Sequence, residues 1–463
     1  MIAGPLFLLA LPLALVPVVY LLRRWRLLAA SLASATALVM ASLCLGLTFD
    51  RPVYVLGWEV ALGEPMVVLG REFALDLAGG LTLGFICLIA TIAFLFAWRI
   101  SQGGLFVPLG LIILSLLGAA VTIRHFLFAV LFLWIAGIVV VFIIQGDRQG
   151  PGRGALRYLV MVSLAVPPLL ITPWLIDLQA VNPDNLALLR YAAFLLAIGF
   201  AILLAVVPFH GWVSAMAADA PPVAAAFVLT VTNAVVLLLM LNLLQSYPWL
   251  SEDPRVFRLL QLGGLLIAAV GGLLAFAQRD FGHLLGYAVL SDMGCTLVAL
   301  CTASPVALTA ALLQIAHRSV GLMLTAMGLA VVRHRAGDDS FANLGGVARR
   351  LPLSTAGLIL GGLSLAGMPL TVGFPGRWAI YRLFSSPDLA LAMLLSGAGV
   401  ALGYLRGLST LLSPSTEPKV RREPFIASLI ILGMIIFCLG LGLRPQWLLS
   451  PIQRVVESFS FLR

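Results

Sequence analysis

The stretch AVVPFHGWVSAMAADAPPVAAAF, residues 205–227, decides the fold because it interrupts an apolar segment long enough to cross a membrane. Pro208 and Gly211 disrupt the helical pattern, and His210 and Trp212 add polar groups beside the disruption. Irregular backbone survives at bilayer depth only where it is buried in protein or faces water. The stretch therefore predicts a broken membrane helix at which ions or protons could meet freed backbone groups.

A second interruption of the same kind is GMPLTVGFPGRW, residues 367–378. Apolar segments on either side of the two breaks predict fourteen spans, with the breaks in the seventh and the twelfth. The spans are 2–22, 27–49, 77–98, 104–122, 125–145, 157–176, 189–218, 222–245, 258–278, 283–302, 305–333, 352–384, 388–412 and 424–443. Matching breaks in two halves of a chain indicate an internal repeat and an ion or substrate path at mid-membrane.

The composition indicates an all-α integral membrane protein. Of 463 residues, 62% are apolar and 10% are charged, and the mean hydropathy is +1.10, whereas about a quarter of a soluble domain is charged. The sequence lacks a P-loop, a dinucleotide fingerprint and a nucleophile elbow, and its five cysteines lie in apolar segments without metal-ligand spacing. We therefore expect no cofactor, no metal site, no catalytic residues and no nucleic-acid partner.

The basic residues predict the orientation. Fifteen of them follow odd-numbered spans and six follow even-numbered ones; because cytoplasmic loops carry the excess of basic residues, we expect both termini on the outer face of a prokaryotic plasma membrane. The outer segment 51–77 is amphipathic with glycine turns and is predicted to form a short β-hairpin.

Several blocks of the sequence resemble one known family. They include VVPFHGWVSAMAADAPP (206–222), AFAQRDFGHLLGYAVLSDMGCTLVAL (275–300) and LSLAGMPLTVGFPGRWAIYRLF (363–384). Together they are similar to the antiporter-like membrane subunits of respiratory complex I, which are shared with Mrp antiporters and membrane-bound hydrogenases. The resemblance covers roughly residues 70–415, and no long lateral helix follows span fourteen, which favours the M-, N- or D-type subunits.

The resemblance implies fourteen transmembrane helices and two inverted five-helix repeats, spans 4–8 and 9–13, with broken helices 7 and 12. The implied domains are an N-terminal part with the hairpin (1–103), a first repeat (104–245), a second repeat (258–412) and a C-terminal helix with its tail (413–463). The resemblance also implies a proton path along buried charges, other membrane subunits as partners and the lipid bilayer as surroundings.

The charges of this path are where the sequence departs from the family. The family's glutamate of span five is replaced by Ile135, and the lysines of spans seven and eight are replaced by Leu203 and Asn233. The only lysine of the chain is Lys419, in a loop, so no shift of alignment restores them. Span twelve keeps a cation as Arg377, which holds a positive charge but does not titrate in proteins.

The ionisable residues that remain inside the membrane are the candidates for an ion path: His210, Asp292, His317, Arg318 and Arg377. Charged groups at this depth are costly and normally face partners. Asp280 and His283, at the start of span ten, are candidates for the point where protons would enter. Each candidate also has a structural interpretation: the histidines as core or capping residues, Asp292 as the partner of Arg318 or Arg377, and Asp280 as a helix cap.

The candidates favour the second repeat, because the first keeps only His210. The first interpretation is a membrane subunit of a complex-I-like or Mrp-like assembly that moves protons or cations through the second repeat, with His317 as the titrating group. The second is a non-pumping structural or docking subunit of such an assembly, and the third is the membrane partner of an ion or inorganic-carbon uptake system. At most, the chain is a non-redox membrane subunit of an NADH:quinone oxidoreductase-like or hydrogenase-like enzyme.

Overall fold

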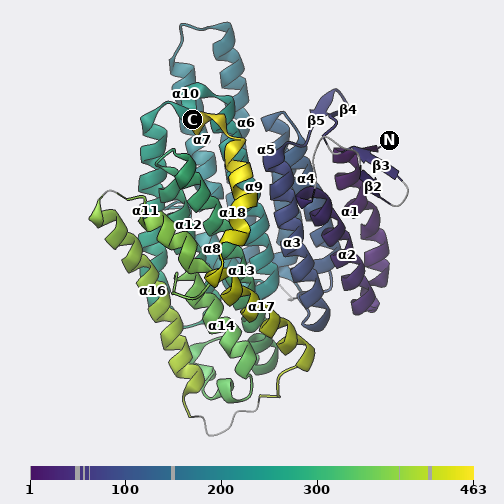
Figure 1. The fold of residues 1–463 in the computed structure, drawn as a ribbon, viewed down its shortest axis with the longest axis vertical. Coiled ribbons are helices and arrows are strands. Elements are labelled where there is room, and N and C mark those ends of the chain that lie inside the picture. Colours follow the sequence, from purple (N-terminus) through teal and green to yellow (C-terminus); the bar gives the residue numbers. More distant parts are fainter. Residues whose placement is uncertain are drawn as a thin grey trace.

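The computed structural model describes residues 2–46, 53–55, 58–61, 63–147, 152–384, 386–414 and 420–462. These residues form a bundle of helices with a few short strands at one edge (Figure 1). By length and composition, eleven helices in the described ranges could cross a membrane, and three shorter helices are also apolar. The all-helical membrane fold predicted from the composition is confirmed.

The N-terminal part holds helices α1 (Gly4–Leu21), α2 (Arg26–Leu45) and α3 (Leu77–Arg99). The segment 51–77, which was predicted to form one short β-hairpin, contains two antiparallel strand pairs among its described residues. In one pair β2 (Val53–Val55) joins β3 (Trp58–Ala61), with β1 (Ile2–Ala3) parallel to β3; in the other β4 (Met66–Val68) joins β5 (Arg71–Phe73). Leu69 and Gly70 between β4 and β5 both have positive φ, +50° and +73°, which a tight two-residue turn requires.

The remaining helices fall into two sets of similar order. The first set is α4 (Phe106–Thr122), α5 (Phe126–Gln145), α6 (Arg153–Val181), α7 (Ala187–Leu203), α8 (Gly211–Asp219) and α9 (Pro222–Ser246). After the short α10 (Pro248–Ser251), the second set is α11 (Pro254–Ala277), α12 (Phe281–Leu300), α13 (Pro305–Ala336), α14 (Pro352–Leu365), α15 (Gly373–Tyr381) and α16 (Pro387–Leu412). Helices α17 (Phe425–Leu443) and α18 (Gln446–Glu457) complete the chain.

Both predicted helix breaks are present. Helix α7 ends at Leu203 and α8 begins at Gly211, while α14 ends at Leu365 and α15 begins at Gly373. The two interruptions have equal length, residues 204–210 and 366–372, and the helices that follow them, α8 and α15, have nine residues each. Positive φ angles at Ala205 (+54°) and Gly367 (+79°) turn the chain out of the helical path.

Helices α9, α12 and α13 form the interior of the bundle. In their most apolar segments, 94% of the residues of α9, 83% of those of α12 and 94% of those of α13 are buried. The corresponding shares are 33% in α16 and 39% in α11. Glycines let α12 approach its neighbour α11: a Cβ on Gly294 would lie 2.5 Å from the backbone nitrogen of Ala268. Polar residues of α12 and α13 are therefore held inside the protein, away from lipid.

Both ends of the chain lie toward the upper end of the molecule in Figure 1. The C-terminal residues dock on the end of α9, where the Gln245 side chain donates to Ser460 Oγ (2.6 Å) and accepts from the Phe461 backbone N–H (3.2 Å). Helix α18 (yellow) passes in front of α9 and packs against α3 and α13. The two termini therefore share one side of the bundle.

Candidate functional site

Three charged residues meet inside the second set of helices. Asp292 of α12 lies between Arg377 of α15, with Oδ1 3.4 Å from Nε, and Arg318 of α13, with Oδ2 3.6 Å from Nη1. The exposed fractions of Asp292, Arg377 and Arg318 are 0%, 0% and 3%. The prediction that these side chains point into the protein is confirmed, and the carboxylate is shared by two guanidinium groups.

The second helix break holds Arg377 in place. Its Nη1 donates to the carbonyl of Ala366, just beyond the end of α14, at 3.2 Å, where the helix dipole favours a positive charge. The guanidinium stem passes so close to Gly367 that a Cβ there would lie 2.4 Å from Arg377 Cδ. The Ser364 hydroxyl also accepts a hydrogen bond from the Gly373 backbone N–H, at 3.0 Å, across the break. The break therefore both exposes a carbonyl and makes room for the cation that satisfies it.

Neutral polar side chains complete the cluster. Gln314, one turn before Arg318 on α13, donates to Asp292 Oδ1, and Asn233 of α9 accepts from Arg318 Nη2. On the other side Arg377 Nη2 donates to Ser291 Oγ at 3.5 Å, and Ser291 contacts Ser396 of α16 at 2.7 Å. Ser396 in turn donates to the carbonyl of Ala268 in α11, at 2.6 Å. Hydrogen bonds thus connect α9, α11, α12, α13, α15 and α16 through one buried centre.

His317 lies beside this cluster in sequence but is not bonded to it. It is fully buried, and neither ring nitrogen has a hydrogen-bond partner among the described residues. Because adjacent residues on a helix point about 100° apart, His317 and Arg318 face different neighbours. Buried imidazole nitrogens are normally hydrogen-bonded, so the two unpaired ring nitrogens distinguish His317 from the residues of the charged cluster.

His210 does not join the cluster. Among the described residues it makes no hydrogen bond or ion pair with the charged centre, and its Nδ1 has no partner. Near the end of α7, Trp212 Nε1 donates to Ile202 O at 3.4 Å, a carbonyl that also accepts from the Ala205 backbone N–H at 3.2 Å. In the described part of the protein, Trp212 rather than His210 is therefore the side chain that donates to a carbonyl of α7.

The positions where the family carries its other charges have apolar surroundings here. Leu203 and Asn233 line one small cavity of about 30 Å³, together with Trp212 and Met293, which is room for about two water molecules. Ile135 is 42% exposed on the outside of α5. The first set of helices is thus apolar at these points, except that Asn233 reaches the guanidinium of Arg318.

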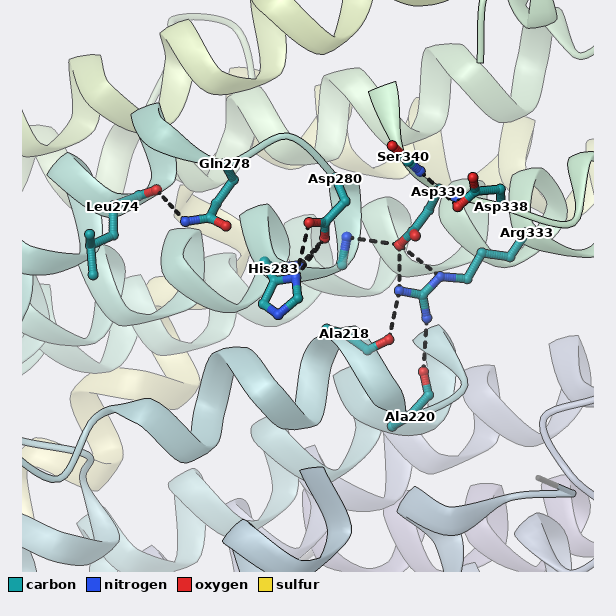
Figure 2. A network of polar contacts seen from close by, with 11 residues as sticks. Ala218, Ala220, Leu274, Gln278, Asp280, His283, Arg333, Asp338, Asp339 and Ser340 are labelled. Atoms are coloured by element: carbon teal, nitrogen blue, oxygen red, sulfur yellow. Dashed lines mark hydrogen bonds and ion pairs between the residues drawn. The ribbon is translucent and has the colours of Figure 1, made fainter. Parts of the chain in front are cut away.

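Asp280 and His283 belong to a separate polar network (Figure 2). Asp280 caps α12: its Oδ1 accepts from the His283 backbone N–H at 2.8 Å and lies 2.9 Å from His283 Nδ1. Burial raises the pKa of Asp280, but hydrogen bonds from His283 outweigh burial and hold that pKa below its ordinary value. Twelve residues of helix separate Asp280 from Asp292, about 18 Å along α12. The structure therefore does not bring the two groups of candidates together.

Arg333 ties this network to the first broken helix. Its Nε donates to Asp339 Oδ2 at 2.9 Å, and its Nη groups donate to the carbonyls of Ala218 and Ala220, each at 3.0 Å. Figure 2 shows Arg333 between the loop at Asp339 and the end of α8. The network therefore joins the end of α13 to the end of α8.

Comparison with known proteins shows the family. The profile described as NADH:quinone oxidoreductase/Mrp antiporter, TM, matches residues 125–403. The chain belongs to this family of antiporter-like membrane subunits. The matched region contains the two helix breaks, the buried cluster and the network at Asp280.

Similar sequences carry the name NADH-quinone oxidoreductase subunit N. The protein of Chromohalobacter salexigens is 32% identical over 281 residues, which cover 57% of each chain, so this alignment spans little more than half of that relative. The protein of Cereibacter sphaeroides is 29% identical over 90% of this chain and 91% of its own.

Similar solved structures extend over nearly the whole chain. A chain of an archaeal membrane-bound sulfane sulfur reductase superposes with a TM-score of 0.85 at 17% identity, covering 98% of this chain and 97% of its own. A chain of the Mrp complex from Dietzia sp. DQ12-45-1b gives a TM-score of 0.84 at 17% identity, covering 99% of each. At these identities the likeness shows a shared fold.

Proposed function

We propose that this chain is a membrane subunit of a multi-subunit assembly of the complex I or Mrp kind and takes part in moving protons or cations through its second repeat. The observation that carries the proposal is the buried carboxylate of Asp292 between two guanidinium groups. Charges in such a position are costly in a membrane and mark ion pathways. The relatives named NADH-quinone oxidoreductase subunit N support the choice of assembly.

The proposed topology has fourteen crossings. The eleven long helices and the three shorter ones, α4, α7 and α14, supply this number, with α8 and α15 completing the two broken crossings. Equal interruptions, and closing helices of 25 and 26 residues, support inverted repeats over 104–245 and 258–412, flanked by parts 1–103 and 413–463. The distribution of arginines supports placing both termini outside a prokaryotic plasma membrane.

Each buried residue of the charged centre, and His317 beside it, has a separate proposed role in the path. Arg318 and Arg377 keep their charge at all relevant pH values and set the electric field at the centre. Histidine is the side chain whose ordinary pKa lies nearest to neutral pH, so His317 is the proposed proton carrier, with Asp292 compensating the fixed cations. His210 lies in the first repeat, so it could take part only in proton movement through that repeat.

Asp280 and His283 are proposed as the point of proton exchange with the cytoplasm. The His283 side chain is 44% exposed, and the Asp280 carboxylate is within hydrogen-bond distance of its ring. About 18 Å separates this pair from the charged centre, so water and His317 would have to connect the two.

A second candidate function is a structural subunit that seals or extends such an assembly. Ile135 and Leu203, where the family carries ionisable residues, favour it, because the first repeat then offers no titrating group at those points. The two candidates differ in one respect: only the first requires ion movement through this chain.

The test is purification of the full chain in mild detergent, identification of the chains that accompany it, and reconstitution of the intact assembly in vesicles loaded with a pH-sensitive dye. The proposal expects further membrane subunits and a proton or sodium flux that needs this chain. A flux of the same size from an assembly that lacks the chain would contradict it.

A further inference from the structure

A long apolar groove on the surface lies between α7 and α11 and has α9 as its floor. Its volume is about 560 Å³. At one end it is lined by Arg190, Asp253 and Arg255, and at the other by Val206 and Phe209 of the first helix break. The groove therefore leads from the ends of the helices to the middle of the bundle, and it is separate from the charged centre described above.

The length and lining of the groove are suited to a hydrocarbon chain. Its wall along α7 runs from Arg190 to Leu204, about 21 Å of helix at 1.5 Å per residue. A single hydrocarbon chain could extend along this wall, and side chains such as Phe194, Leu259 and Leu262 present apolar surface to it.

The mouth of the groove is suited to an anion. The guanidinium groups of Arg190 and Arg255 are exposed, and neither makes a hydrogen bond or ion pair with another side chain in the described part of the protein. The one carboxylate at the mouth, Asp253, accepts a hydrogen bond from the Arg255 backbone N–H at 2.9 Å. The two cations outnumber it, and guanidinium forks bind phosphate oxygens in pairs.

The beginnings of two helices add to this charge. Arg190 lies in the first turn of α7 and Arg255 in the first turn of α11. Helix N-termini present backbone N–H groups and the positive end of the dipole, which favour an anion at the same place. The apolar groove and the cationic mouth are thus continuous, with the charge at the membrane surface and the hydrocarbon surface at depth.

We propose that this groove binds one anionic phospholipid, with its phosphate on Arg190 and Arg255 and one acyl chain along the groove. The end of the acyl chain then contacts Val206 and Phe209 at the helix break. Helix α11 supports this contact from the other side, since a Cβ on Gly263 would lie 3.2 Å from a methyl carbon of Val206. The lipid thereby fills the apolar space beside an interrupted helix.

The test is native mass spectrometry of the full-length chain, with any subunits that accompany it, after delipidation and titration with phosphatidylglycerol or phosphatidylcholine. We expect one phosphatidylglycerol bound per chain, and binding at least about tenfold weaker, equivalent to about 1.4 kcal/mol, in the double variant Arg190→Gln/Arg255→Gln. Arg258→Gln is the matched control, because Arg258 is exposed on the same turn of α11 but does not line the groove.

A second variant tests the groove without changing its charge. Ala197 lines the groove and is exposed, so Ala197→Trp is expected to exclude the acyl chain and abolish retention. The pair Arg190→Lys/Arg255→Lys, which keeps the charge, is expected to retain part of the binding. Equal binding of the two lipids, unchanged binding in the Arg→Gln double variant, or a photo-cross-linker at residue 197 that captures a protein chain instead of lipid would each overturn the proposal.

Discussion

Substitution of Asp292 by asparagine tests how the buried charges of the second repeat are balanced. The wild-type centre has one carboxylate and two guanidinium groups, so its net charge is +1. Asp292→Asn keeps the shape of the side chain but leaves Arg318 and Arg377 without a counter-ion. Arg318→Gln, in contrast, leaves one carboxylate facing one guanidinium, and the centre becomes neutral.

The distances give the size of the expected effect. At 3.4 Å and 3.6 Å, and with an effective dielectric constant of about 20, each ion pair contributes roughly 5 kcal/mol of Coulomb energy. Part of this is offset because an asparagine needs no desolvation of a charge, and breaking a buried pair typically costs about 3–5 kcal/mol. We therefore expect Asp292→Asn to lower the free energy of unfolding by about 3–5 kcal/mol, and Arg318→Gln by about 1–3 kcal/mol for the lost charged hydrogen bond to Asn233.

Reversible unfolding in mixed micelles of mild detergent and SDS, followed by tryptophan fluorescence, measures these free energies. The double variant Asp292→Asn/Arg318→Gln should be less destabilised than the sum of the single variants, with a coupling energy of about 1.5–3 kcal/mol. Asp184→Asn, at an exposed loop position, is the matched control and should change the stability by less than about 0.5 kcal/mol. If Asp292→Asn behaved like Asp184→Asn, or if the variants were additive, the shared-carboxylate account would be wrong.

Three further predictions use the same unfolding measurement. Arg377→Lys keeps the charge but loses the guanidinium fork that reaches Ala366 O and Ser291 Oγ. The free energy of unfolding should therefore fall by about 1–3 kcal/mol. A variant as stable as the wild type would show that these two hydrogen bonds do not stabilise the break. Asp280→Ala should lower the free energy of unfolding by about 1 kcal/mol at neutral pH, and Asp280→Asn should lower it by only a few tenths of a kcal/mol. Because the pKa of Asp280 lies below its ordinary value, the charge contribution is present above that ordinary value and is lost as the pH falls through the lower folded-state pKa; a difference that grew on acidification would contradict this. Gly294→Ala places a Cβ 2.5 Å from the backbone of α11 and should lower the free energy of unfolding by about 1–3 kcal/mol. Gly433→Ala, whose Cβ would have no atom within 4 Å, should not destabilise the protein. Equal effects of the two variants would contradict the close packing of α11 and α12.

The features that were predictable from the sequence are those with a strong local signal. Proline and glycine disrupt a helix close to their own position in the sequence, so the breaks near Pro208 and Gly373 could be placed to within a few residues. The cost of exposing a charge to lipid was enough to predict that Asp292 and Arg377 point inward. The ion pair itself followed from the small number of possible partners.

The neutral members of the cluster were not predictable in this way. A serine or threonine in an apolar helix normally bonds the carbonyl one turn earlier, as Ser319 and Thr325 do here. Nothing in the local sequence separates these residues from Ser291 and Ser396, which connect three helices. The contact from Arg318 to Asn233 depends on the packing of α13 against α9, which hydrophobic periodicity does not specify.

The interruption at the first break was predicted correctly, and for His210 both a place on an ion path and a capping function were considered. An imidazole beside a break is a candidate donor to the carbonyls of the preceding helix, and in the structure the indole of Trp212 donates to Ile202 O. The geometry of the interruption decides which side chain turns back toward α7, and a residue two positions later in the next helix is the one that does.

The most direct test of the central claim, that ions cross through the second repeat, is the proton flux of the intact assembly in vesicles with His317→Ala. The account predicts that this variant abolishes the flux, while His334→Ala, the same change at the partly exposed end of the same helix, leaves it unchanged. It also predicts that Leu203→Lys or Ile135→Glu, which restore single family charges in the first repeat, do not raise the flux. A wild-type flux from His317→Ala would contradict the account and leave the chain as a structural subunit.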